Sequence, residues 1–172
     1  TLYVSAKEYP VVVEIDMAAR AIAATIALPV GGQGLRVSAD GKWLYVGDFH
    51  RPLLHVIDCA ARTLADTVPL TGVPGWPFVS PDGRHLVVTT WDEPGGRGYA
   101  EILDTADLRR RRVVDLPAEP FHALFSDDSA SFHVALGNGE VPRIDVASAA
   151  IVEGGFHVGG SMPEALVRWP AV

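Results

Sequence analysis

A few histidine, tryptophan and charged side chains are the groups of this sequence best suited to bind a ligand. An imidazole can ligate a metal or a haem iron, and an indole can stack on a planar molecule. His50 is followed by Arg51, and Trp91 is followed by Asp92, so each aromatic ring has a charged neighbour in the chain. The candidate ligand-binding residues are His50, Arg51, Trp76, Trp91, Asp92, His122 and Glu164.

Signatures of catalysis and of metal binding are missing from the sequence. None of the six histidines forms a His-x-x-x-His pair, and the single cysteine, Cys59, excludes an internal disulfide and a cysteine-based zinc site. There is no Gly-x-Ser-x-Gly nucleophile elbow. We therefore predict no catalytic residue and no cofactor. The alternative is a haem or a single metal ion held by His50 or His122.

The overall charge narrows the classes of partner. The 14 basic and 21 acidic residues give a formal net charge of -7, which argues against binding to nucleic acids or to anionic membranes. The longest apolar stretches, such as Ala21–Val30, are too short to span a bilayer. The chain begins directly in strand-like residues, so we expect that any export signal has been removed or never existed, and the localisation stays open. A protein or a small molecule is therefore the expected partner.

A repeat runs through the whole chain. An aliphatic residue followed by aspartate recurs with spacings of 42, 46 and 41 residues, at Ile15-Asp16, Ile57-Asp58, Leu103-Asp104 and Ile144-Asp145. An Asp-Gly turn between apolar runs occurs at Ser38–Gly41 and Ser80–Gly83, and more loosely at Ser126–Ser129, and it predicts β-hairpins. Because the four aspartates recur in every repeat, we expect them to bond turn amides and not to perform chemistry.

Each repeat is predicted to contain four antiparallel strands. Units of about 42 residues with four short strands are typical of β-propeller blades, so the fold class is all-β and residues 1–172 form a single β-propeller domain. The expected repeats are 1–31, 32–73, 74–119 and 120–162, followed by a closing strand at 163–172. The basic run Arg109–Arg112 is expected to be solvated, in a turn that leads into a strand beginning at Arg111.

The motifs resemble those of the YVTN family of β-propeller repeats. The resemblance is carried by Ser-Pro-Asp-Gly at residues 80–83, Leu-Tyr-Val at 44–46 and Val-Ile-Asp at 56–58, and it covers essentially the whole chain. It implies an extracytoplasmic or secreted location. It also implies that lactonases and haem-binding subunits, which have similar repeats, provide an alternative function.

Two arrangements of the ring fit the register of the repeats. The chain is expected to open at the second strand of one blade and to close with a first strand at 163–172, which would complete that blade. It is then either a closed four-bladed ring or half of a larger ring. A homodimer or further sequence would complete the larger ring.

One face of the propeller is expected to carry the function. The loops that enter the first strands and those that join the second and third strands open onto the same face, where Trp76 and His122 occupy equivalent positions near the axis. The third repeat is longer by four residues within the loop that follows Trp91. We predict a non-catalytic module that presents this face to a protein or small ligand. The alternative is a lactonase-like enzyme or a haem- or metal-binding propeller with a pocket at the channel mouth.

Overall fold

The chain folds as antiparallel β-sheets in a computed structural model, which describes residues 1–92, 96–160 and 166. Within these residues the strands form four successive sheets, and no helix could span a membrane. The first sheet contains β1 (Leu2–Ser5), β2 (Val11–Asp16) and β3 (Ala21–Ala27), and the second contains β4 (Gly32–Val37), β5 (Trp43–Asp48), β6 (Leu53–Asp58) and β7 (Thr63–Pro69). The third contains β8 (Val73–Val79), β9 (His85–Asp92), β10 (Arg97–Asp104) and β11 (Asp107–Leu116), and the fourth contains β12 (Pro120–Phe125), β13 (Ser131–Leu136), β14 (Glu140–Asp145) and β15 (Ala150–His157).

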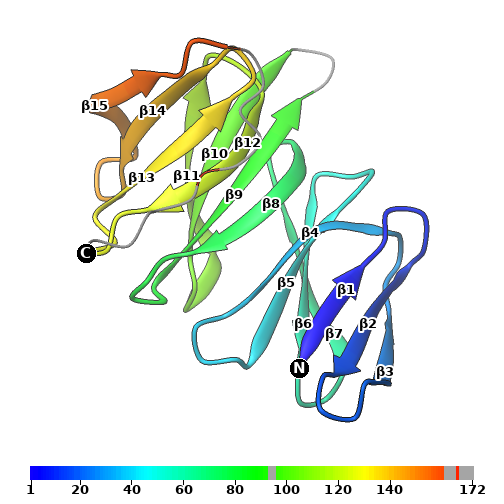
Figure 1. The fold of residues 1–172 in the computed structure, drawn as a ribbon. Coiled ribbons are helices and arrows are strands. Elements are labelled where there is room, and N and C mark those ends of the chain that lie inside the picture. Colours follow the sequence, from blue (N-terminus) through cyan, green and yellow to red (C-terminus); the bar gives the residue numbers. More distant parts are fainter. Residues whose placement is uncertain (93–95, 161–165, 167–172) are drawn as a thin grey trace.

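The sheets follow one another along an arc, so the prediction of an all-β propeller fold is confirmed (Figure 1). The first strands of the second, third and fourth sheets, β4, β8 and β12, lie next to one another on the inside of the arc. The first and last sheets stand at its two opposite ends (Figure 1). The expected closing strand at 163–172 lies outside the described residues, except for Leu166.

The Asp-Gly hairpins form through a local hydrogen-bond pattern that their sequence dictates. Ser38 Oγ donates to Asp40 Oδ1 at 2.6 Å and accepts the Trp43 amide proton at 2.9 Å. Gly41 has a φ of +74°, a conformation that glycine adopts without steric cost. The fourth repeat forms the same kind of turn although Ser129, with a φ of 60°, replaces the glycine.

The repeated aspartates close the turns after the third strands, as expected. Asp16 and Asp58 each accept two backbone N–H groups from the residues that follow them. Asp104 accepts the amide proton of Ala106, and Asp145 accepts bonds from the amide and the hydroxyl of Ser148. These carboxylates therefore have a structural role in each repeat.

The hydrophobic core consists of three layers, one between each pair of neighbouring sheets. Alternate residues of each strand point to opposite faces, so the two middle sheets bury apolar side chains on both faces. Ion pairs cross two of the layers, Glu14 with Arg62 at 2.8 Å and Asp66 with Arg109 at 2.7 Å. Both pairs are partly exposed, so burial of apolar surface supplies most of the stability of these layers.

The prediction that Arg109–Arg112 lie in a turn was wrong, whereas the expected exposure to solvent is confirmed for Arg109, Arg110 and Arg111. These residues lie inside β11, which begins at Asp107, and their guanidinium groups have partners. Arg109 pairs with Asp66, Arg111 Nη1 donates to Glu101 Oε2 at 3.0 Å, and Arg112 donates to the Ala147 carbonyl at 2.6 Å. Partners on neighbouring strands and sheets hold this run in a strand, and they lie too far away in the chain to be read from local sequence.

Candidate binding face

Strand pairing places two sets of loops at the same end of the sheets. Gly32, at the start of β4, pairs with Asp48 at the end of β5, and Val73, at the start of β8, pairs with Trp91 near the end of β9. The loops that enter first strands and those that leave second strands are therefore neighbours. We call this end of the molecule the loop face.

Trp76 and Trp91 meet in an aromatic pocket on the loop face. The pocket is a cavity of about 120 Å³, and 38% of Trp76 is exposed to solvent. Its lining residues include Gln33, Trp76, Trp91, Glu119 and Phe121. Two of the candidate residues therefore share one cavity with an acidic residue, although they lie 15 positions apart in the sequence.

Two neighbouring residues fix the position of Trp76. The buried hydroxyl of Thr89 accepts the Trp76 amide proton at 3.3 Å and donates to the Phe121 carbonyl at 3.1 Å, so one side chain ties together two walls of the pocket. Gly34 lies against Trp76, and a Cβ at Gly34 would come within 2.7 Å of Trp76 Cδ1. The absence of a side chain at Gly34 therefore leaves the space that the indole occupies.

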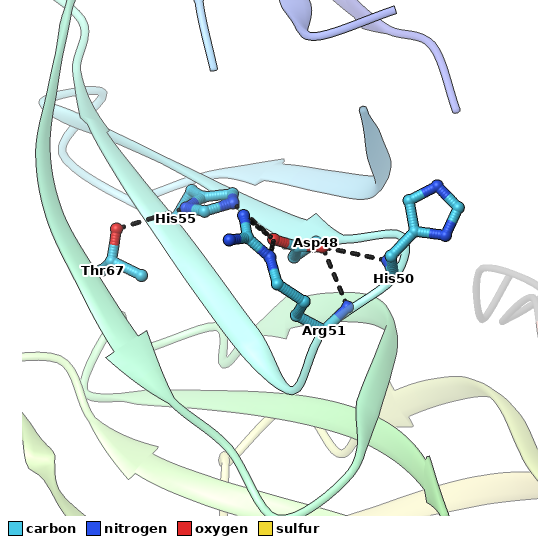
Figure 2. A network of polar contacts seen from close by, with 5 residues as sticks. All are labelled: Asp48, His50, Arg51, His55 and Thr67. Atoms are coloured by element: carbon cyan, nitrogen blue, oxygen red, sulfur yellow. Dashed lines mark hydrogen bonds and ion pairs between the residues drawn. The ribbon is translucent and has the colours of Figure 1, made fainter. Parts of the chain in front are cut away.

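A second group of candidates lies in the loop between β5 and β6, where Asp48 organises the backbone (Figure 2). Asp48 Oδ1 accepts the amide protons of His50 and Arg51 at 2.9 and 3.0 Å. Asp48 Oδ2 accepts from the guanidinium of Arg51, at 2.7 Å from Nη2, and it lies 3.1 Å from Nε2 of His55. Both ring nitrogens of His55 have partners on neighbouring strands, since its Nδ1 also lies 3.3 Å from the Thr67 hydroxyl.

Burial determines the protonation states in this network. Burial alone would raise the pKa of Asp48, but the amide protons of His50 and Arg51 and the Arg51 guanidinium hold it below its usual value. Burial lowers the pKa of His55 and outweighs the opposite effect of the Asp48 carboxylate. His55 is therefore neutral: Nε2 donates to Asp48 and Nδ1 accepts from Thr67.

This network presents an exposed loop with aromatic and basic side chains. The imidazole of His50 points away from Asp48 (Figure 2) and contacts the Phe49 ring, with 4.8 Å between the ring centroids. Lys7, from the loop between β1 and β2, places its ammonium 4.9 Å from the centroid of the Phe49 ring. His50 and Arg51 do not line the aromatic pocket, so the loop face has two separate groups of candidate residues.

The structure does not bring Trp76 and His122 into one cavity. His122 lines a different cavity of about 370 Å³ together with Arg36 and Phe78, and its ring packs 4.6 Å from that of Phe78. Burial and the nearby Arg36 both lower the pKa of His122, and its Nδ1 accepts the amide proton of Leu166 at 3.3 Å. The two equivalent sequence positions thus have different surroundings.

The remaining candidates have varied positions. Asp92 is partly exposed at the end of β9, and Glu164 lies outside the described residues. Cys59 is half-buried beside Tyr3, and burial raises the pKa of its thiol, which disfavours a nucleophilic role. In the part of the chain that the structure describes, no three His, Cys, Asp or Glu side chains are grouped closely enough to hold a metal ion.

Sequence reasoning missed three residues of the pocket. Glu119 and Phe121 flank Pro120 at the start of β12, and Thr89 lies in the middle of β9. Threonine is common in strands for its shape alone, so nothing in the sequence distinguishes Thr89 from its neighbours. A clue for the other two was available. Phe121 lies at the start of β12, the place that Gln33 has in β4, and Glu119 comes just before that strand.

The sheet arrangement and the loop face together define a protein of β-propeller fold. Among solved structures, the chain is similar to hydrazine synthase from Kuenenia stuttgartiensis, with a TM-score of 0.80, 22% identity, and coverage of 90% of this chain and 46% of that one. It is also similar to the Cps50 (Swd1) β-propeller domain of Myceliophteria thermophila, with a TM-score of 0.73, 11% identity, and coverage of 93% and 52%. The chain therefore spans about half the length of each of these structures.

At these identities the likeness concerns the fold alone. Comparisons with protein-family models and with curated proteins give no match.

Proposed function

We propose that the chain is a non-catalytic β-propeller module that binds a protein partner by receiving a basic side chain of that partner in the aromatic pocket. The observation that carries the proposal is the convergence of Trp76, Trp91 and Glu119 on one cavity of the loop face. We further propose that its repeats are of the YVTN type, on the strength of the Ser-Pro-Asp-Gly and Leu-Tyr-Val motifs.

The size of the pocket favours a single side chain over a whole small molecule. Small-molecule sites usually enclose about 300–1,000 Å³, whereas this cavity measures about 120 Å³. Tryptophan is also enriched among the few residues that contribute most of the binding energy at protein interfaces. A pocket of this kind suits one anchoring side chain of a larger partner.

The chemistry of the pocket favours a positive charge on that side chain. The face of an indole attracts a cation, and arginine is the side chain most often found there. Glu119 adds a carboxylate to the same cavity, and the net charge of -7 attracts basic partners at a distance. An arginine of the partner would therefore combine stacking with charge pairing.

Nuclear magnetic resonance of the ¹⁵N-labelled chain tests this proposal. On titration with N-acetyl-arginine amide we expect the indole N–H signals of Trp76 and Trp91 to shift, while that of Trp43, which lies near the Asp-Gly hairpins, stays in place. The neutral analogue N-acetyl-citrulline amide should produce smaller shifts. Trp76→Ala should abolish the effect, and Glu119→Gln should weaken binding by about fivefold, the value of a partly exposed ion pair near 1 kcal/mol.

The result would contradict the proposal if arginine and citrulline amides shifted the signals equally, or if neither did. Tyr9→Ala provides a matched control, because Tyr9 is an exposed aromatic residue outside the pocket. An absorbance scan of the purified chain tests the proposed absence of a cofactor. A visible band would instead favour a haem- or metal-binding propeller.

A further inference from the structure

Three of the four sheets bury the same set of apolar positions, and the first sheet leaves them exposed or partly exposed. In the second, third and fourth sheets these residues are fully buried: Leu44, Val46 and Ile57; Leu86, Val88 and Leu103; Phe132, Val134 and Ile144. Their counterparts in the first sheet are Leu2, Val4 and Ile15, and Leu2 and Val4 are 45% and 43% exposed. We call the surface formed by these three residues the leading face.

The opposite pattern holds at the other end of the arc. Two positions at or just after the end of the last strand in the first three sheets are at most 7% exposed, namely Ile26 and Leu28, Val68 and Leu70, and Val114 and Leu116. Their counterparts in the fourth sheet, Phe156 in β15 and Val158 directly after it, are 53% and 49% exposed. We call the surface formed by Phe156 and Val158 the trailing face.

Within the chain, these two sets of positions pack against each other. Ile26 and Leu28 of the first sheet share a cluster with Leu44, Val46 and Ile57 of the second, and the other two layers repeat this pairing. The leading and trailing faces are thus the two halves of one sheet-to-sheet interface. Each lacks its partner because the first and last sheets stand at opposite ends of the arc (Figure 1).

We propose that a second copy of this chain covers both faces and closes an eight-bladed ring. The leading face of each copy would pack on the trailing face of the other, so that a two-fold axis produces two identical interfaces and leaves no exposed sheet end. The chain matches about half the length of each of two solved structures of similar fold, consistent with half a ring. The proposal is independent of what the loop face binds.

The polar residues on the trailing face are compatible with such a contact. The ring of His133 packs on Phe156, with 5.6 Å between the centroids. Arg143 occupies the position that Glu14 has in the first repeat, and Glu14 forms an ion pair across a sheet-to-sheet layer. A charged side chain at this position is therefore already accommodated in one layer of the same kind.

The solution mass of the chain is the first test. Light scattering should give about 37 kDa, twice the mass of the 18.4 kDa chain, at concentrations where the dimer forms. A monomer at every concentration would overturn the proposal and leave further propeller blades of a longer polypeptide as the covering element. Assemblies that grow beyond a dimer would also overturn it, because they would show that the ring does not close.

Charged variants of the two faces make the test specific. Val4→Lys and Phe156→Asp should each produce a folded monomer, since one unpaired charge is then placed in both interfaces of the ring. An equimolar mixture of the two variants should restore the dimer, because it contains one unchanged interface and one in which lysine faces aspartate. Tyr9→Lys, at an exposed residue outside both faces, should leave the dimer intact.

Circular dichroism must show that each variant is folded. We expect this result because Val4 and Phe156 are exposed in the single chain. If the single variants remain dimeric, or if the mixture remains monomeric, the two faces do not pair as proposed.

Discussion

His55 links the core of the second sheet to the loop face through a single chain of hydrogen bonds. It is fully buried, and its two ring nitrogens contact Asp48 and Thr67 on neighbouring strands. A buried polar group costs free energy unless it is hydrogen-bonded, so this arrangement is stable only with all three members present. The network fixes the loop that presents His50 and Arg51, and its role is to position them.

The network predicts a loss of stability on mild acidification. Burial places the pKa of His55 below 6.5 in the folded chain, so the unfolded chain binds more protons as the pH falls through 6.5 towards the folded pKa. The free energy of unfolding should therefore decrease in this window. Urea denaturation of the wild type and of His55→Gln, above and below pH 6.5, measures the effect.

The variant should be less stable at neutral pH by about 1–3 kcal/mol, because Asp48 loses a buried partner. It should also lack the part of the pH dependence that belongs to His55. Asp48 itself titrates in a lower window, since its pKa lies below 3.8 in the folded chain. Equal pH dependence of the two proteins between pH 6.5 and 5 would show that His55 is not held neutral by the fold.

Among the elements of the fold, the Asp-Gly hairpins depend most directly on one residue type, the glycine that adopts a positive φ in the turn. Gly41 has a φ of +74° and no atom near the position of an added Cβ, so a substitution there meets only backbone strain. We expect Gly41→Ala to destabilise the chain by about 1 kcal/mol. Thermal or urea denaturation measures the difference.

Gly160→Ala is the matched control for this prediction. Among the described residues, no atom lies near an added Cβ at Gly160 either, but Gly160 has no positive φ, so alanine there should leave stability unchanged or raise it slightly. A cost at Gly160 equal to that at Gly41 would show that the loss does not come from the left-handed conformation.

Local signals of this kind explain why the sheets could be predicted from sequence. The Asp-Gly turns and the recurring aspartates are contacts between residues a few positions apart, and each was found where the repeat placed it. The sequence prediction of a turn failed for Arg109–Arg112, where the partners of Arg109 and Arg112, Asp66 and Ala147, belong to other repeats. Contacts between distant segments also determine which residues line each cavity of the loop face. The separation of His122 from Trp76 could therefore not be predicted from the sequence.

At the scale of the whole molecule, the position of a sheet in the arc decides how much equivalent residues of different sheets contribute to the stability of the fold. The same two positions of the last strand are covered in three sheets and open in the fourth. Residues that are alike in sequence therefore differ in energy, because a repeat protein gains stability from contacts between neighbouring repeats. The exposed ends are the surfaces from which such contacts are missing.

Two valines, one in a covered sheet and one on the trailing face, allow this difference in stability to be measured. Val114 is 5% exposed and Val158 is 49% exposed, although Val114 occupies the first and Val158 the second of these two positions in their repeats. At concentrations too low for the proposed dimer to form, Val114→Ala should cost about 1–3 kcal/mol and Val158→Ala less than about 0.5 kcal/mol. At concentrations where two copies close the ring, the cost of Val158→Ala should increase, because its side chain is then buried by a leading face. Urea denaturation of both variants over a range of protein concentrations measures this, and a cost for Val158→Ala that stays small at every concentration would mean that no second copy covers the trailing face.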